Sequence, residues 1–81
     1  MTINEWYVFN KDFFNCDFVV KVLKRGSRSN DDILLDSVTV KREGLIEIFD
    51  DYEILKYGIR VVERPGGNGH TIGFCVWPPI N

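Results

Sequence analysis

The segment from Asp17 to Leu23 alternates in a way that places Phe18, Val20 and Val22 on one face of a β-strand. Successive side chains of a strand point to opposite faces, so this strand has one apolar face to bury. The longest apolar runs, such as 18–20 and 74–77, are short. A chain of 81 residues has room for one hydrophobic core, and we expect a single globular domain over residues 1–81.

Further segments have strand character. Aromatic and β-branched residues predict strands at 5–9, 33–40, 59–63 and 71–77. Pro78 and Pro79 follow the last segment, and they end the strand because proline has no N–H to donate to a neighbouring strand.

The segment 45–57 has two interpretations. A helix is favoured by an i, i+3, i+4 stripe made of Leu45, Ile48, Phe49, Tyr52 and Leu55. Gly58 then stands at the C-cap position, although no Ser, Asp or Asn lies just ahead of Leu45 as an N-cap. The alternative is a hairpin that turns at Asp50 and Asp51, which would make the protein all-β.

With the helix, the elements follow the order β-β-β-α-β-β. We therefore predict an α+β fold, with a small, mostly antiparallel sheet of five strands and one helix that covers one face.

Composition and charge exclude several classes of protein. The net charge is −2 and 44% of the residues are hydrophobic, which is typical of a folded globule and not of a disordered chain. No apolar stretch approaches the roughly 20 residues of a membrane-spanning helix. The first residues lack the basic start of a secretory signal, so we expect a cytoplasmic location. Cys16 and Cys75 are expected as buried apolar residues, with a bridge between them as the alternative in an oxidising compartment.

The stretch 64–71 is the most glycine-rich part of the chain and contains its only histidine. Backbone amides in such a loop, together with a cation, suit the binding of a phosphate or carboxylate. The residues for this role are Arg64, Gly66, Gly67, Gly69 and His70. The spacing matches neither a Walker A loop nor a dinucleotide-binding fingerprint, and a plain hairpin turn is the competing interpretation.

A basic cluster made of Lys21, Lys24, Arg25 and Arg28 occupies eight residues without an acid among them. Such a cluster suits contacts with nucleic-acid phosphates. Together with the glycine-rich stretch it supports an alternative function, the binding of a small anionic ligand or nucleic acid. The acidic pI of about 5.2 weighs against nucleic acid.

The outer side of the expected helix combines apolar and acidic residues: Ile46, Glu47, Asp50, Asp51, Ile54 and Tyr57. An exposed apolar patch with an acidic rim is typical of a protein interface. Our leading hypothesis is therefore a non-enzymatic interaction module that binds another protein with a basic surface, or a second copy of itself.

No catalytic, metal-binding or cofactor motif is present. His70 has no nucleophile or carboxylate at a recognised spacing, and Cys16, Cys75 and His70 do not form a recognised zinc pattern. We expect no enzymatic activity, no metal and no cofactor. In size and in its lack of motifs the chain resembles the small accessory proteins of phages and mobile elements, which implies inhibition or regulation by direct binding.

Overall fold

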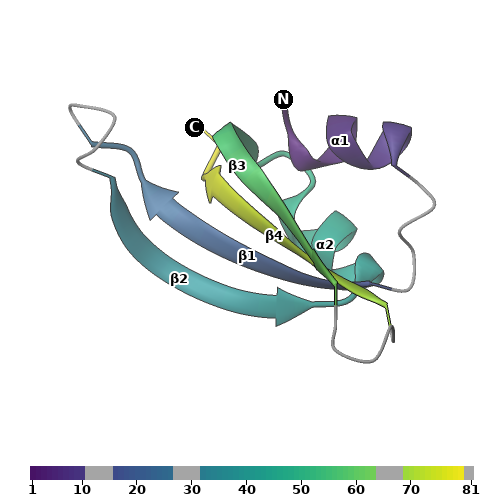
Figure 1. Ribbon diagram of the computed structural model, residues 1–81. Helices are drawn as coiled ribbons and strands as arrows, with labels where there is room; N and C mark the ends of the chain where they lie inside the picture. The colour runs from purple at the N-terminus through teal and green to yellow at the C-terminus, as the bar shows by residue number, and fades with distance from the viewer. Residues whose placement is uncertain (11–15, 27–31, 64–68, 80–81) are drawn as a thin grey trace.

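The computed structural model describes residues 1–10, 16–26, 32–63 and 69–79. These residues form two helices and one mixed sheet of four strands (Figure 1). The elements are α1 Ile3–Phe9, β1 Asp17–Lys24, β2 Ile33–Val40, α2 Arg42–Phe49, β3 Glu53–Glu63 and β4 His70–Trp77. The predicted α+β class is confirmed, whereas the predicted count of five strands and one helix is wrong.

The sheet has the strand order β2-β1-β4-β3. The two outer pairs, β1 with β2 and β3 with β4, are antiparallel, and the central pair, β1 with β4, is parallel. Helix α2 connects the two edge strands. The two central strands, β1 and β4, come from opposite halves of the chain. The four-stranded sheet therefore forms only when the two halves pair with each other.

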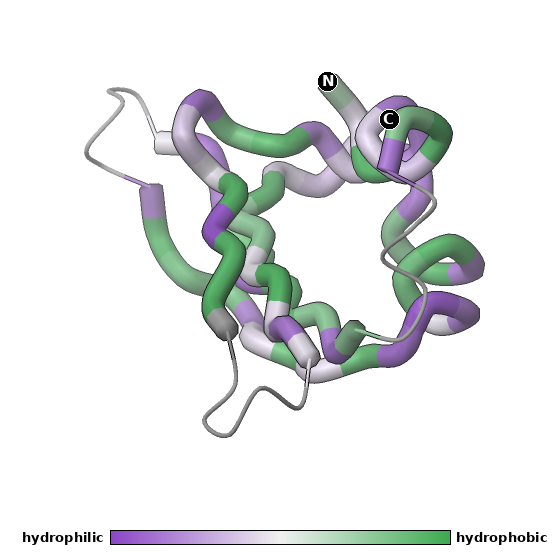
Figure 2. Tube along the Cα trace, turned by 45° about the vertical axis from the view of Figure 1, so that its right-hand side comes forward, coloured by the Kyte–Doolittle hydropathy of each residue, from purple (hydrophilic) through white to green (hydrophobic). Residues whose placement is uncertain are grey.

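The core lies between one face of the sheet and the two helices. Phe18, Val20 and Val22 are buried, as the alternating pattern predicted, and they pair with buried residues of β4. The Trp6 ring of α1 meets the Phe74 ring edge to face, with the ring centroids 4.9 Å apart. Figure 2 shows the helical segments across from the strands, with hydrophobic stretches on both. The other face of the sheet carries neither helix.

The predicted strand at 5–9 is wrong, because these residues belong to helix α1. The Thr2 hydroxyl accepts a hydrogen bond from the Glu5 backbone N–H at 3.2 Å, and the Glu5 carboxylate accepts one from the Thr2 N–H at 2.9 Å. This capping box satisfies N–H groups at the helix start that have no partner within the helix. Ile3 and Trp6 lie three residues apart, so both reach the core from one helical face. Capping and burial together outweigh the strand preference of the aromatic residues.

The segment 45–57 combines parts of both interpretations. Helix α2 ends at Phe49, the chain turns at Asp50 and Asp51, and strand β3 begins at Glu53. The helix starts at Arg42 and not at Leu45, and Lys41 stands at its N-cap position without a side-chain capping hydrogen bond. The helix stops because the following residues pair elsewhere: the Ile54 N–H donates to the Met1 carbonyl at 2.8 Å.

Strand β3 contains a large bulge. Ile54 pairs with Val76 and Ile59 with Phe74, so residues 55–58 lie opposite Cys75 alone. A Cβ on Gly58 would lie 2.7 Å from the Cys75 carbonyl oxygen and 2.8 Å from that of Leu55. Gly58 is thus required by the close approach of two backbones, and its predicted role as a helix C-cap is wrong.

Candidate functional site

The six residues predicted to form one partner-binding patch lie in separate places. Ile54 is only 8% exposed and belongs to the core, while Tyr57 is 91% exposed at the β3 bulge. Asp50 and Asp51 are exposed in the turn after α2. The patch assumed a helix that continues past Phe49. Because the chain becomes a strand there, helical spacing no longer relates these residues.

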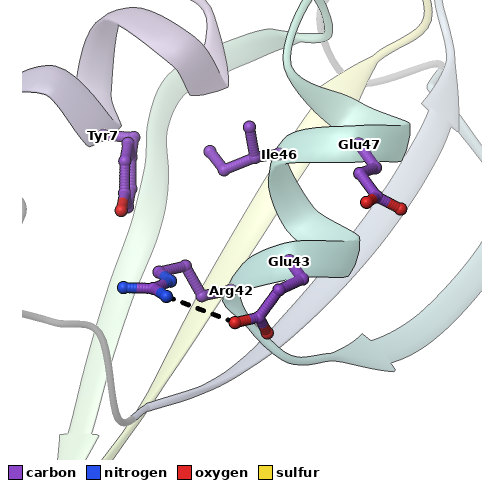
Figure 3. A pocket seen from close by; sticks show the side chains of 5 residues that line it. All are labelled: Tyr7, Arg42, Glu43, Ile46 and Glu47. Atoms are coloured by element: carbon purple, nitrogen blue, oxygen red, sulfur yellow. Dashed lines mark hydrogen bonds and ion pairs between the residues drawn. The ribbon is translucent and has the colours of Figure 1, made fainter.

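Ile46 and Glu47 remain on α2, where they line a groove between the two helices (Figure 3). This groove, which we call the helix groove, has a volume of about 460 Å³ and is lined by Tyr7, Arg42, Glu43, Ile46 and Glu47. Tyr7 comes from α1 and faces Ile46 across the gap. The α2 residues at 42, 43, 46 and 47 share one side of the helix because 46 and 47 each lie four positions after 42 and 43, about one helical turn.

The rim of the helix groove is acidic. The Arg42 guanidinium donates to the Glu43 carboxylate over 3.3 Å, so the cation of the groove is already paired. A hydrogen bond from its own backbone, with a smaller contribution from Arg42, lowers the pKa of the Glu43 carboxyl. Glu43 therefore carries its negative charge at neutral pH, and Glu47 stands exposed one turn further along α2.

Sequence reasoning missed Tyr7 and Arg42 as groove residues. Tyr7 was assigned to a strand, although the Thr2-to-Glu5 spacing of a capping box was readable as the start of a helix. Arg42 was missed because the helix was expected to start at Leu45, three residues after its true first residue.

The predicted anion site is only partly covered by the described residues. Arg64, Gly66, Gly67 and Arg28 lie outside them. Gly69 has a φ of 109°, a conformation that favours glycine, and His70 is the first residue of β4.

The cations of the basic cluster that the structure describes do not gather at one place. Lys21 lies on the sheet face away from the helices, whereas strand alternation puts Lys24 on the other side. The Arg25 guanidinium lies 3.9 Å from the centre of the Trp77 ring, as in a cation–π contact.

The two cysteines are free and lie on different faces of the sheet. Cys16 is buried with the core, as expected, whereas Cys75 is partly exposed opposite Lys21. A bridge between them is not formed. Within the described ranges, no group of three or more His, Cys, Asp or Glu side chains converges as metal ligands would.

Neither helix of the described part of the chain is long and apolar enough to cross a membrane. Comparisons with protein-family models, with curated proteins and with solved structures found no match to this chain.

Proposed function

We propose that the protein is a small non-enzymatic interaction module that holds a basic, partly apolar segment of another protein in the helix groove. The observation that carries this proposal is the pairing of Tyr7 and Ile46 across the gap between two helices. Tyrosine is a frequent anchor at interfaces because it combines a large apolar ring with a hydroxyl group. An apolar side chain of the partner enters between these two residues.

The charge of the rim supports a basic partner. Glu43 and Glu47 line the groove, and Asp50 and Asp51 extend the negative charge past the end of α2. Lysine or arginine residues beside the partner's apolar anchor meet these carboxylates, which speeds association and selects among partners. A second copy of the chain is disfavoured at this place, because two acidic rims would face each other.

Two more apolar residues of α1 are exposed, although neither lines the helix groove. Phe9 is 83% exposed at the end of this helix, and Val8 before it is exposed as well. Large exposed apolar side chains are typical of protein interaction sites. Inhibition or regulation by direct binding is the activity that such a module would have.

The test is affinity capture of the tagged protein from a lysate of its source, followed by binding assays with the purified partner. Ile46→Glu is expected to abolish binding, and reversing both acids with Glu43→Lys and Glu47→Lys is expected to weaken it by about tenfold or more. Ile48→Glu is the matched control, since Ile48 is an exposed isoleucine of the same helix outside the groove.

The proposal requires that the Ile48→Glu variant still binds the partner and that circular dichroism shows all variants to be folded. A partner that survives Ile46→Glu, or that is lost equally with Ile48→Glu, would place the interface elsewhere.

A further inference from the structure

The sheet face away from the helices carries a second concave site, independent of the helix groove. This hollow, which we call the sheet hollow, measures about 220 Å³. Its lining includes Lys21 of β1, Arg60 of β3, Gly73 and Cys75 of β4, and Tyr57 of the β3 bulge. Gly73 lies between the buried residues Ile72 and Phe74, so its position faces away from the core.

Two cations flank β4 from its two sides. Lys21 pairs with Cys75, and Arg60 pairs with Gly73. From the strand spacing and the rise per residue, the Cα atoms of Lys21 and Arg60 are roughly 12 Å apart. Both side chains are long enough to converge on one small anion above β4, and no carboxylate stands among the described residues that line the hollow.

Gly73 keeps the space between the two cations open. A Cβ at this position would come no closer than 3.8 Å to another atom, the Arg60 carbonyl oxygen. Packing therefore does not require glycine there. Because Gly73 has no side chain, the sheet face has room for a ligand at this position.

Tyr57 adds an aromatic ring to the lining of the hollow, and the backbone of this residue has an unfavourable conformation. Its φ of 61° is rarely adopted by residues other than Gly, Asn or Asp. The ring is 91% exposed, so core packing does not explain why tyrosine occupies this position. Strain at an exposed residue beside a hollow points to a functional use of its side chain. The Lys56 ammonium lies 5.4 Å from the ring centre and adds positive charge nearby.

We propose that the sheet hollow binds a nucleotide unit, with its phosphate between Lys21 and Arg60 and its base stacked on Tyr57. Arginine matches phosphate with two parallel hydrogen bonds, and lysine adds a point charge. An exposed aromatic ring stacks on bases of any sequence. A free nucleotide and single-stranded nucleic acid present this same chemistry, and the experiment distinguishes them.

The test uses ATP in calorimetric titrations and a fluorescein-labelled oligothymidylate of about fifteen nucleotides in anisotropy titrations. Arg60→Ala and Lys21→Ala are each expected to raise the Kd of the bound probe by about tenfold. Gly73→Val fills the hollow and is expected to block binding. Lys24→Ala is the matched control, because Lys24 is an exposed lysine of the same strand on its other side.

Tyr57→Gly separates binding from folding. The substitution removes the ring and at the same time relieves the positive φ, so binding is expected to weaken by at least fivefold while the protein stays folded. Binding of the oligonucleotide alone identifies single-stranded nucleic acid as the ligand, and binding of ATP identifies a free nucleotide. The proposal is overturned if neither probe binds at millimolar concentration, if Arg60→Ala and Gly73→Val leave the Kd unchanged, or if Lys24→Ala weakens binding as much as Lys21→Ala.

Discussion

The indole N–H of Trp77 donates a hydrogen bond to an Asp32 carboxylate oxygen at 2.8 Å, joining residues 45 positions apart. The other oxygen of this carboxylate accepts from the Gly26 backbone N–H at 2.9 Å. Asp32 precedes β2, Gly26 follows β1, and Trp77 ends β4. One carboxylate therefore links the ends of three strands.

Removing this carboxylate is expected to destabilise the fold. Asp32→Ala loses both hydrogen bonds and should lower the free energy of unfolding by about 2 kcal/mol, whereas Trp77→Phe loses one and should cost about 1 kcal/mol. Because both changes remove the same contact, the double variant should cost less than the sum of the two. Urea unfolding of the four proteins measures this coupling, and strict additivity would contradict the link.

The capping box of α1 makes stability depend on pH. Hydrogen bonds from the backbone N–H and then the side chain of Thr2 lower the pKa of Glu5 from its ordinary value of 4.5. A carboxyl with a lower pKa in the folded state stabilises the fold above its unfolded pKa. That stabilisation is lost as the pH falls through the folded pKa. Glu5→Gln keeps the capping geometry without a charge. Between pH 5 and pH 3 the unfolding free energy of this variant should therefore fall less than that of the parent protein, because one titrating carboxyl group is removed. Thermal unfolding across this range checks the difference, and equal losses in both proteins would argue against the capping carboxylate.

Two glycines of the sheet are expected to respond oppositely to alanine. Gly58→Ala would press its Cβ against two carbonyl oxygens and should cost more than about 2 kcal/mol of unfolding free energy. Gly73→Ala makes only an ordinary contact, 3.8 Å from the Arg60 carbonyl oxygen, and should stabilise the strand by about 0.5 kcal/mol, because alanine loses less backbone entropy. Guanidinium unfolding of the pair compares them directly. A tolerated Gly58→Ala would mean that the β3 bulge is not held as described.

Replacing the strained residue of the β3 bulge should stabilise the protein. Tyr57→Gly removes the unfavourable φ of 61° and is expected to raise the unfolding free energy by about 1 kcal/mol. Tyr57→Phe keeps the strain and serves as the control, with a change near zero. A loss of stability in the glycine variant would show that the ring itself supports the fold.

Substitutions at two isoleucines, Ile48 and Ile54, distinguish the observed strand β3 from a helix that continues through this segment. Ile54→Glu places a charge in the core, where the side chain is 8% exposed, and should cost more than about 3 kcal/mol. Ile48→Glu changes a side chain that is 56% exposed and should alter stability by less than about 0.5 kcal/mol. The sequence-based interpretation expected the reverse, with Ile48 inside and Ile54 outside. Circular dichroism and urea unfolding of both variants decide between the two arrangements.

Local patterns by themselves determined a large part of the secondary structure. Strand β2 has the predicted bounds, β1 and β4 begin or end within one residue of theirs, and Pro78 follows the last strand as expected. A period of two along a strand depends on neighbouring residues alone, so it is readable without knowing the partner. The capping box at Thr2 and Glu5 is equally local, but the prediction did not use it and relied on the aromatic content of the same segment.

The tertiary structure alone decided where α2 stops, how the strands pair and which residues share a site. Residues after Asp51 satisfy their backbone by pairing with the N-terminus and with β4, and this pairing outweighs a helical stripe that continues through Leu55. Lys21 and Arg60 line the same hollow only because β1 and β3 both pair with β4 in the sheet. The physical reason is that a side-chain pattern states which face of an element is apolar, whereas its neighbour is chosen by contacts with distant parts of the chain.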